Sequence, residues 1–283
     1  MPPSQSQSVP GSGAAAVRPH IAVIIPALNE EETIADVVRG IPPALVDEVI
    51  VVDNGSTDAT AERARQAGAK VIAEHRRGYG GACRAGVLAT PQSGILVFLD
   101  GDGSDCPELM NRLLEPILAG THDFVIGSRL RGRREAGSMN LAQVWAGRIA
   151  GVMLKLVYGV RYSDMCPFRA IRYDALQQLG MQEETYGWNL EMQMRAARAK
   201  MRILEVPVDH RRRAGGRSKV SGNLAGTIRA SSRILLTFVR VLLARKRPNW
   251  DEQSTEGSTP LLRPLSRSHT ARATQIRPAG PHR

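Results

Sequence analysis

Blocks of apolar and polar residues alternate along residues 20–127, and they predict strands followed by helices. Five short apolar runs are typical of strands buried on both faces of a parallel sheet: 21–25, 48–52, 69–73, 95–99 and 123–126. Helical patterns lie between them, over 30–39, from Thr57 or Asp58 to about Ala67, and over 78–88. This alternation predicts an α/β fold with a mostly parallel sheet sandwiched between helices.

The pattern changes after Gly127. It predicts an Arg- and Gly-rich loop over 130–138, helices over 139–158, 174–179 and 189–199, and a strand over 201–207. A basic loop follows over 211–219, and an amphipathic helix is expected from about 224 to 244. The polar ends predict a disordered leader over 1–19 and a basic, disordered tail over 246–283. We therefore expect a single domain over 20–245.

Charge is distributed unevenly along the 283 residues. The net charge is +11, yet residues 198–247 alone hold fourteen Lys and Arg against two acids. Such a stretch predicts a local surface for phosphates, an anionic membrane or nucleic acid. Three scattered cysteines argue against a disulfide scaffold and favour a reducing, cytoplasmic compartment. We find no membrane-spanning run of roughly 20 apolar residues and no signal-peptide pattern.

The candidate chemistry lies where the predicted strands end. Asp100-Gly101-Asp102 directly follows the apolar run 95–99, and polar turns also follow the first two strands, over 26–30 and 53–58. Each turn alone is most often only a turn, but the carboxyl ends of parallel strands share one edge, where nucleotides bind. Two carboxylates there can share Mg²⁺ or Mn²⁺ with substrate phosphates. No GxGxxG pattern follows the first predicted strand, and no GxxxxGK[ST] pattern occurs in the sequence. Both observations argue against a dinucleotide-binding fold and a P-loop.

Several longer motifs occur in order: IIPALNEEETI, VIVVDNGSTDAT, RGYGGACRAGV, ILVFLDGDGSDCPE and FVIGSRL. Together they resemble the family 2 glycosyltransferases of GT-A fold. The later PFRAIRYDAL, YGWNLEMQMRAA and RRRAGGRSKVSG resemble the branch of dolichyl- or polyprenyl-phosphate mannose and glucose synthases. The resemblance covers about residues 20–245.

The resemblance implies a donor site for a nucleoside diphosphate sugar. Asp100 and Asp102 would hold Mg²⁺ or Mn²⁺ on the diphosphate, where the cation neutralises the leaving group. The loop around Gly78 would close beside the nucleotide, although an ordinary turn is an equal interpretation of the loop alone. The implied nucleotide-sugar residues are Pro26, Ala27, Asn29, Glu30, Asp53, Gly78, Gly80, Asp100 and Gly101.

The resemblance also implies an acceptor site for a phosphate. Arg129 would face the acceptor phosphate, and a solvated loop arginine is the alternative. Glu191 would orient the acceptor or act as a base, although the residues alone favour a solvated helix position. Asp164 is expected to pair with Arg169. The implied catalytic residues are Asp102, Glu191 and Arg129, and the implied phosphate-binding residues are Arg129, Arg148, Arg213, Arg217, Ser218 and Lys219.

The predicted function is inverting transfer of a hexose from a nucleoside diphosphate sugar to a polyprenyl phosphate. One alternative is a glycosyltransferase with a soluble or glycan acceptor. The other is a non-catalytic nucleic-acid-binding protein, and the lack of interleaved aromatic and basic residues argues against it. The 224–244 helix is expected either to lie on an anionic membrane, which makes the enzyme peripheral at the cytoplasmic face, or to pack on the core.

Overall fold

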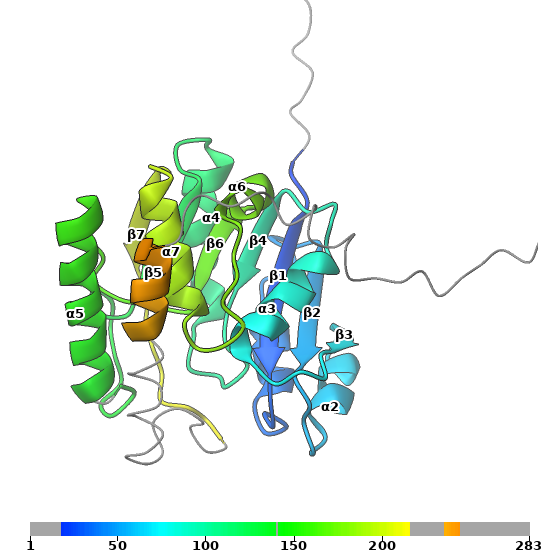
Figure 1. Cartoon of the computed structure of the whole chain (residues 1–283). Coiled ribbons are helices and arrows are strands. Elements are labelled where there is room, and N and C mark those ends of the chain that lie inside the picture. Colours follow the sequence, from blue (N-terminus) through cyan, green and yellow to red (C-terminus); the bar gives the residue numbers. More distant parts are fainter. Residues whose placement is uncertain (1–17, 140, 216–234, 244–283) are drawn as a thin grey trace, which may run out of the picture. The chain divides into compact units, whose positions relative to one another are not determined.

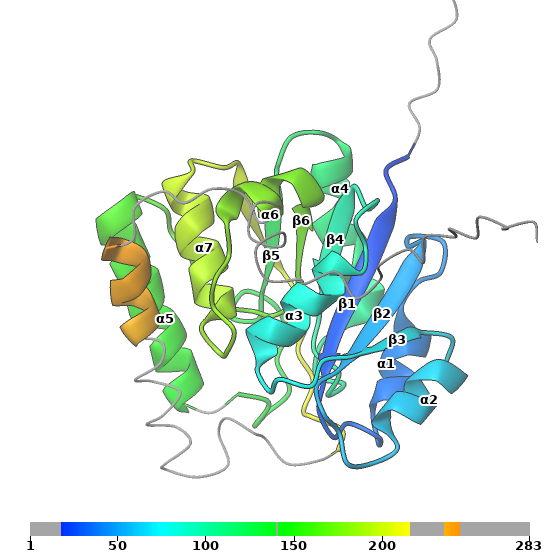
Figure 2. The same ribbon diagram turned by 45° about the vertical axis from the view of Figure 1, so that its right-hand side comes forward.

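Seven strands form one sheet in the order β3-β2-β1-β4-β6-β5-β7 (Figures 1 and 2). This computed structural model describes residues 18–139, 141–215 and 235–243. Nearly all of the predicted leader, the whole predicted tail, the end of the basic loop and most of the last predicted helix lie outside these residues.

The predicted parallel strands form one half of the sheet. β1 is buried along its whole length and pairs with β2 on one side and β4 on the other. Ala27 lies opposite Asp53, so the carboxyl ends of β1 and β2 meet at one edge. The apolar runs therefore predicted these strands correctly, with these bounds: β1 (Ile21–Ala27), β2 (Glu48–Asp53), β3 (Lys70–Ala73) and β4 (Ile95–Phe98).

The other half of the sheet contains a strand that the sequence analysis did not predict. β6 (Arg169–Arg172) runs antiparallel between β4 and β5 (Phe124–Ser128), and β7 (Ile203–Pro207) pairs parallel with β5. Four residues with an arginine at each end do not show the pattern of a buried strand. Since Arg169 lies opposite Phe98, the segment before β6 reaches the carboxyl edge beside Asp100.

Helices cover the sheet between the strands. α3 packs against β1 and β2, and α4 packs against β5 and β6. The sequence analysis missed α4, in which Pro116 interrupts the helical pattern. A short 3-10 turn, η1 (Pro107–Leu109), precedes it. The first four helices are α1 (Ile34–Gly40), α2 (Thr60–Gln66), α3 (Tyr79–Leu88) and α4 (Asn111–Leu118).

Three further helices follow β5, and the helical residues 235–243 lie beside the first of them, α5 (Figure 2). α5 packs against α7, which the sequence analysis placed within one residue of its bounds. Among the described residues, no helix combines the length and apolar character needed to cross a membrane. The three helices are α5 (Leu141–Tyr158), α6 (Tyr173–Leu179) and α7 (Trp188–Arg198).

Candidate active site

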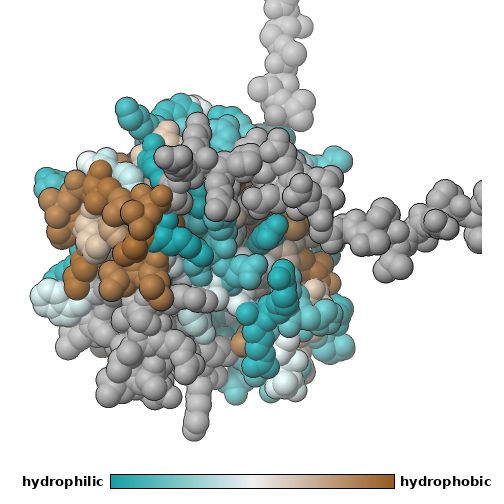
Figure 3. Space-filling model, in the orientation of Figure 1, coloured by the Kyte–Doolittle hydropathy of each residue, from teal (hydrophilic) through white to brown (hydrophobic). Residues whose placement is uncertain are grey.

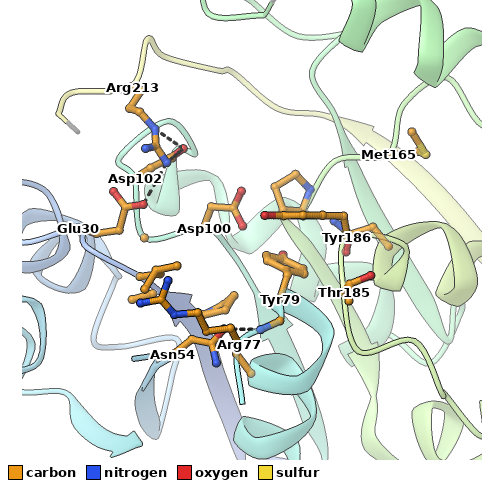
Figure 4. Close-up of a pocket in the computed structure, with 18 of the residues that line it drawn as sticks. Glu30, Asn54, Arg77, Tyr79, Asp100, Asp102, Met165, Thr185, Tyr186 and Arg213 are labelled. Carbon is orange, nitrogen blue, oxygen red and sulfur yellow. Dashed lines mark hydrogen bonds and ion pairs between the residues drawn. The ribbon is translucent and has the colours of Figure 1, made fainter. Parts of the chain in front are cut away.

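A cavity of about 620 Å³ lies at the carboxyl edge of the parallel strands. Segments far apart in the sequence meet there, and Figure 4 shows their side chains around a common space. Nine of the residues predicted for the site line the cavity: Pro26, Ala27, Glu30, Gly78, Asp100, Gly101, Asp102, Arg129 and Arg213.

The two carboxylates that follow β4 are held by their own turn. The amide of Asp100 donates to Oδ2 of Asp105 over 3.1 Å. Oδ1 of Asp102 accepts hydrogen bonds from the amide and hydroxyl of Ser104, at 3.0 and 2.6 Å. These contacts fix the turn while both carboxylates line the cavity.

The two carboxyl groups have opposite pKa shifts. Burial, together with the neighbouring charges of Asp102 and Asp105, raises the pKa of Asp100 well above its ordinary value. Burial also acts to raise the pKa of Asp102, but the hydrogen bonds of Ser104 and the charge of Arg213 outweigh it and hold that pKa below the ordinary value. One carboxyl of this turn therefore has a raised pKa and the other a lowered pKa.

The residues present fit a divalent cation that the protein encloses only in part. Oδ1 of Asp100 is buried and has no hydrogen-bond partner among the described residues, and a cation would supply one. Within residues 18–139, 141–215 and 235–243, no group of three or more His, Cys, Asp or Glu side chains could enclose a metal. Mg²⁺ and Mn²⁺ often take one or two carboxylates and complete their shell with water and substrate phosphates. Asp100 and Asp102 would hold such an ion together with a bound diphosphate.

Arg213, in the basic loop, reaches across the cavity to two acids. Its Nη2 atom lies 3.0 Å from Oε1 of Glu30 and 3.0 Å from Oδ2 of Asp102 (Figure 4). A guanidinium in this position can exchange a carboxylate for the phosphate oxygens of a ligand, because both are bidentate anionic partners. The other predicted residues of this loop, Arg217, Ser218 and Lys219, lie outside the described residues.

Arg129 and Asp164 form a buried, bidentate ion pair. Nε and Nη2 of Arg129 each lie 2.7 Å from a carboxylate oxygen of Asp164, which also accepts the Arg129 amide at 3.0 Å. Burial acts to raise the pKa of Asp164, but the hydrogen bonds and charge of Arg129 hold it below its ordinary value. The interpretation of Arg129 as a solvated loop arginine is wrong, because its side chain is only 14% exposed.

The predicted pairing of Asp164 with Arg169 is also wrong. Arg169 is fully buried at the start of β6, and its guanidinium donates to the backbone carbonyls of Cys166 and Asn189. The fold places Arg129 directly after β5, and its guanidinium is the one that reaches Asp164.

Asn54 and two glycines shape the loop at the start of α3. Oδ1 of Asn54 accepts the amide of Gly78 at 2.7 Å, and its Nδ2 donates to two backbone carbonyls of the same loop. A Cβ atom at Gly78 would collide with the carbonyl oxygen of Glu184, and one at Gly80 with that of Glu183. Gly80 does not line the cavity, so close packing against this neighbouring segment explains its glycine.

Two predicted donor-site residues stabilise turns and lie outside the cavity lining. Oδ1 of Asp53 accepts the amide of Ser56 at 3.0 Å, and Oδ1 of Asn29 accepts the amide of Thr57 at 2.8 Å. Asn29 has a left-handed backbone with φ of 50°, which asparagine tolerates better than most residues. Both residues hold the turns that carry Glu30 and Asn54 into the cavity.

Glu191 does not line the cavity either, and the prediction of a solvated position for it is wrong. It is fully buried, and its Oε2 accepts the amides of Gln182 and Glu183 at 2.9 and 2.6 Å. Its Oε1 accepts Nε of Arg195, one turn along α7, at 2.8 Å. The carboxylate is thereby occupied by structural contacts.

Arg148 lies apart from the cavity, on the exposed side of α5. Its guanidinium carbon is 5.8 Å from the ring centroid of Trp145, a cation–π arrangement. This geometry supports a surface position for Arg148 rather than contact with a ligand in the cavity.

Several lining residues were missed by the sequence analysis. Tyr79 lies within the RGYGGACRAGV motif, but the sequence analysis gave a role only to the glycines of that motif. Tyr186 and Asn189 lie within the YGWNL motif, which points to a site only through family resemblance. The lining residues missed are Leu28, Asn54, Arg77, Tyr79, Ala82, Met165, Pro167, Thr185, Tyr186 and Asn189.

Comparison with known proteins places this chain in a family. Residues 22–180 match the model of glycosyl transferase family 2. An uncharacterized glycosyltransferase of Mycobacterium tuberculosis is 38% identical over 230 residues, which are 78% of this chain and 97% of the relative. The undecaprenyl-phosphate mannosyltransferase of Micrococcus luteus is 33% identical over 73% of this chain and 89% of its own length.

A similar solved structure is the glucosyl-3-phosphoglycerate synthase of Mycobacterium tuberculosis in complex with Mn²⁺, UDP-glucose and phosphoglyceric acid. Its TM-score is 0.66 at 26% identity, and the match covers 80% of this chain and 81% of that one. The predicted family and fold are therefore confirmed: this chain belongs to glycosyl transferase family 2.

Proposed function

We propose that this enzyme transfers a hexose from a nucleoside diphosphate sugar to a polyprenyl phosphate, with inversion at the anomeric carbon. The observation that carries the proposal is the cavity itself, which two carboxylates after β4 line together with Arg77, Arg129 and Arg213. This arrangement suits two phosphorylated substrates, one bound through a cation and the other through guanidinium groups.

The donor side of the cavity suits a nucleotide. Ala27 at the end of β1, Glu30 after β1 and Asn54 after β2 would hold the base and ribose, with the loop at Gly78 beside them. Asp100 and Asp102 would hold Mg²⁺ or Mn²⁺ against the diphosphate. The bound cation neutralises charge on the leaving diphosphate. The solved glucosyl-3-phosphoglycerate synthase carries Mn²⁺ with a UDP-sugar, which supports this assignment.

The acceptor side suits a phosphate more than a neutral hydroxyl. Arg129 lines the cavity while Asp164 fixes its Nε and Nη2 edge, so the guanidinium is held in one orientation. A phosphate is already ionised at neutral pH and requires little help from a base. A transfer that requires little help from a base is consistent with Glu191 being buried outside the cavity.

The relative from Micrococcus luteus supports a polyprenyl acceptor, because it is an undecaprenyl-phosphate mannosyltransferase. Polyprenyl phosphates are long-chain lipids, so we further propose that the enzyme works as a peripheral protein at the cytoplasmic face of a membrane. The basic stretch over 198–247 would favour an anionic lipid surface there.

A soluble phosphorylated acceptor is the second candidate. It is favoured by the solved glucosyl-3-phosphoglycerate synthase, whose complex contains phosphoglyceric acid. Both candidates use the same donor chemistry and differ only in what the acceptor phosphate is attached to.

A paired transfer assay tests the two candidates. The enzyme is incubated with Mn²⁺ and either GDP- or UDP-hexoses, together with undecaprenyl phosphate in detergent or with 3-phosphoglycerate, and the products are identified by mass spectrometry. We expect a hexosyl phospholipid from wild type and none from Asp102→Asn. Product from 3-phosphoglycerate alone would reject the lipid acceptor, and no product from any donor would reject the proposed reaction.

A further inference from the structure

α5 carries a row of large apolar side chains on its outer side. Its inner side combines small residues with Leu154, which is fully buried, and a Cβ atom at Gly151 would collide with the carbonyl oxygen of Tyr162. Four large residues recur along the opposite side and are exposed, and Leu156 reaches 80%. A surface helix of a soluble protein normally carries charged and polar residues on its outer side. The exposed row consists of Trp145, Ile149, Val152 and Leu156.

Residues 235–243 also carry exposed apolar side chains on their outer side, and two hydrogen bonds to Glu183 anchor them. Phe238 and Val241 are buried on the inner side, while the outer side is formed by exposed aliphatic residues. The buried carboxylate of Glu183 accepts the hydroxyl of Thr237 at 3.0 Å and Nη2 of Arg240 at 2.6 Å. This anchor fixes which side of the helix points outward. The exposed row consists of Leu235, Leu236, Val239, Leu242 and Leu243.

The two rows form one surface, which we call the apolar face. Figure 3 shows it as a single hydrophobic area over α5 and residues 235–243. Soluble monomers seldom expose a contiguous apolar area of this kind unless it binds something. Among the described residues, the other exposed large apolar side chains are Val157, also on α5, and Leu88, Leu118 and Tyr186, which lie elsewhere.

The charges on these helices indicate what the apolar face binds. Residues 141–158 and 235–243 contain no Asp or Glu; Arg148 and Lys155 are exposed, whereas Arg240 pairs with Glu183. Aliphatic residues with a tryptophan and flanking basic groups are typical of helices that lie in a bilayer interface. Two copies joined face to face would bring like charges together, which opposes self-association. Phosphate groups of anionic lipids would instead complement these cations.

We propose that the apolar face docks on the surface of an anionic bilayer, with α5 and residues 235–243 lying in the headgroup region. The choice of a membrane as the partner rests on the proposed function. Glu183 connects the apolar face to the candidate active site, because its carboxylate also accepts the amide of Thr185 at 3.1 Å, and Thr185 lines the cavity. Docking would therefore fix one wall of the cavity next to the lipid phosphates.

Vesicle co-sedimentation of the full chain tests the proposal. Phosphatidylcholine vesicles with and without phosphatidylglycerol are compared for wild type, Leu156→Glu and Leu243→Glu, with Leu118→Glu on α4 as the matched control. We expect wild type to sediment with the anionic vesicles and each face variant to lose about tenfold in binding. The control should bind as wild type does. Because Leu156 and Leu243 are exposed, the variants should keep the wild-type melting temperature.

Three results would overturn the proposal. These are failure of wild type to bind anionic vesicles at low salt, an equal loss in the Leu118→Glu control, and a dimer in light scattering that Leu156→Glu converts to monomer. The assay contains no nucleotide sugar and no polyprenyl phosphate. Vesicle binding can therefore be observed without hexose transfer, and hexose transfer without vesicle binding. The two proposals are thus tested separately.

Discussion

The ion pair of Arg129 and Asp164 allows a sharp test of the structure. Arg129→Met would leave the Asp164 carboxylate, 2% exposed, without its cation. Two hydrogen bonds of 2.7 Å would be lost, and only backbone amides would still donate to that carboxylate. Breaking a buried pair in this way costs about 3–5 kcal/mol. We expect a loss of that size in the free energy of unfolding at pH 7.

Urea denaturation of a double-mutant cycle measures this loss. Asp164→Asn removes the buried charge and keeps an acceptor oxygen for one of the two backbone amides, so the double variant Arg129→Met with Asp164→Asn should recover part of the stability that the single Arg129 variant loses. Arg172→Met is the matched control, because its pair with Asp174 is exposed on both sides. That control should lose less than about 1 kcal/mol.

The pH dependence gives the cycle a second readout. In wild type the pKa of Asp164 is held below its unfolded value, so this stabilisation is present above the unfolded pKa and is lost as pH falls through the folded pKa. In Arg129→Met the unpaired buried carboxyl can protonate, so its deficit should shrink between pH 7 and pH 4. The reasoning is refuted by a deficit below about 1 kcal/mol, or by a double variant no more stable than the single one.

Two further predictions concern the cavity, and a third concerns His210, a buried residue outside the cavity lining whose Nδ1 lies 3.8 Å from Oδ1 of Asp105. Asp102→Asn, or EDTA on wild type, should abolish transfer without lowering the melting temperature, and full activity in EDTA after dialysis would contradict the cation site. Arg213→Ala should lower kcat/KM roughly ten- to a hundredfold through a lost charge-assisted contact, whereas Arg211→Ala, whose exposed partner is Glu108, should not. Burial and the charge of Arg129 lower the pKa of His210 to about 4, so NMR titration should find it neutral from pH 7 down to that value, and an ordinary value near 6.5 would be inconsistent with the structure.

The sequence by itself determined the parallel half of the sheet and the position of its functional edge. Runs such as 21–25 and 95–99 are local signals, because a strand buried on both faces must be apolar at successive positions. The acidic turn of Asp100 and Asp102 follows such a run directly. Its location at the carboxyl edge therefore required no knowledge of distant residues.

Only the tertiary structure decided which partners the polar residues find. Asp164 lies 35 residues from Arg129, and Glu191 is enclosed by amides of another segment, so no local pattern could distinguish structural pairs from ligand contacts. The helical period of α5 likewise shows that the helix has distinct sides but not which side meets the protein. Only the packed structure shows that Leu154 is buried and Leu156 is exposed, because burial depends on the neighbours that the fold supplies.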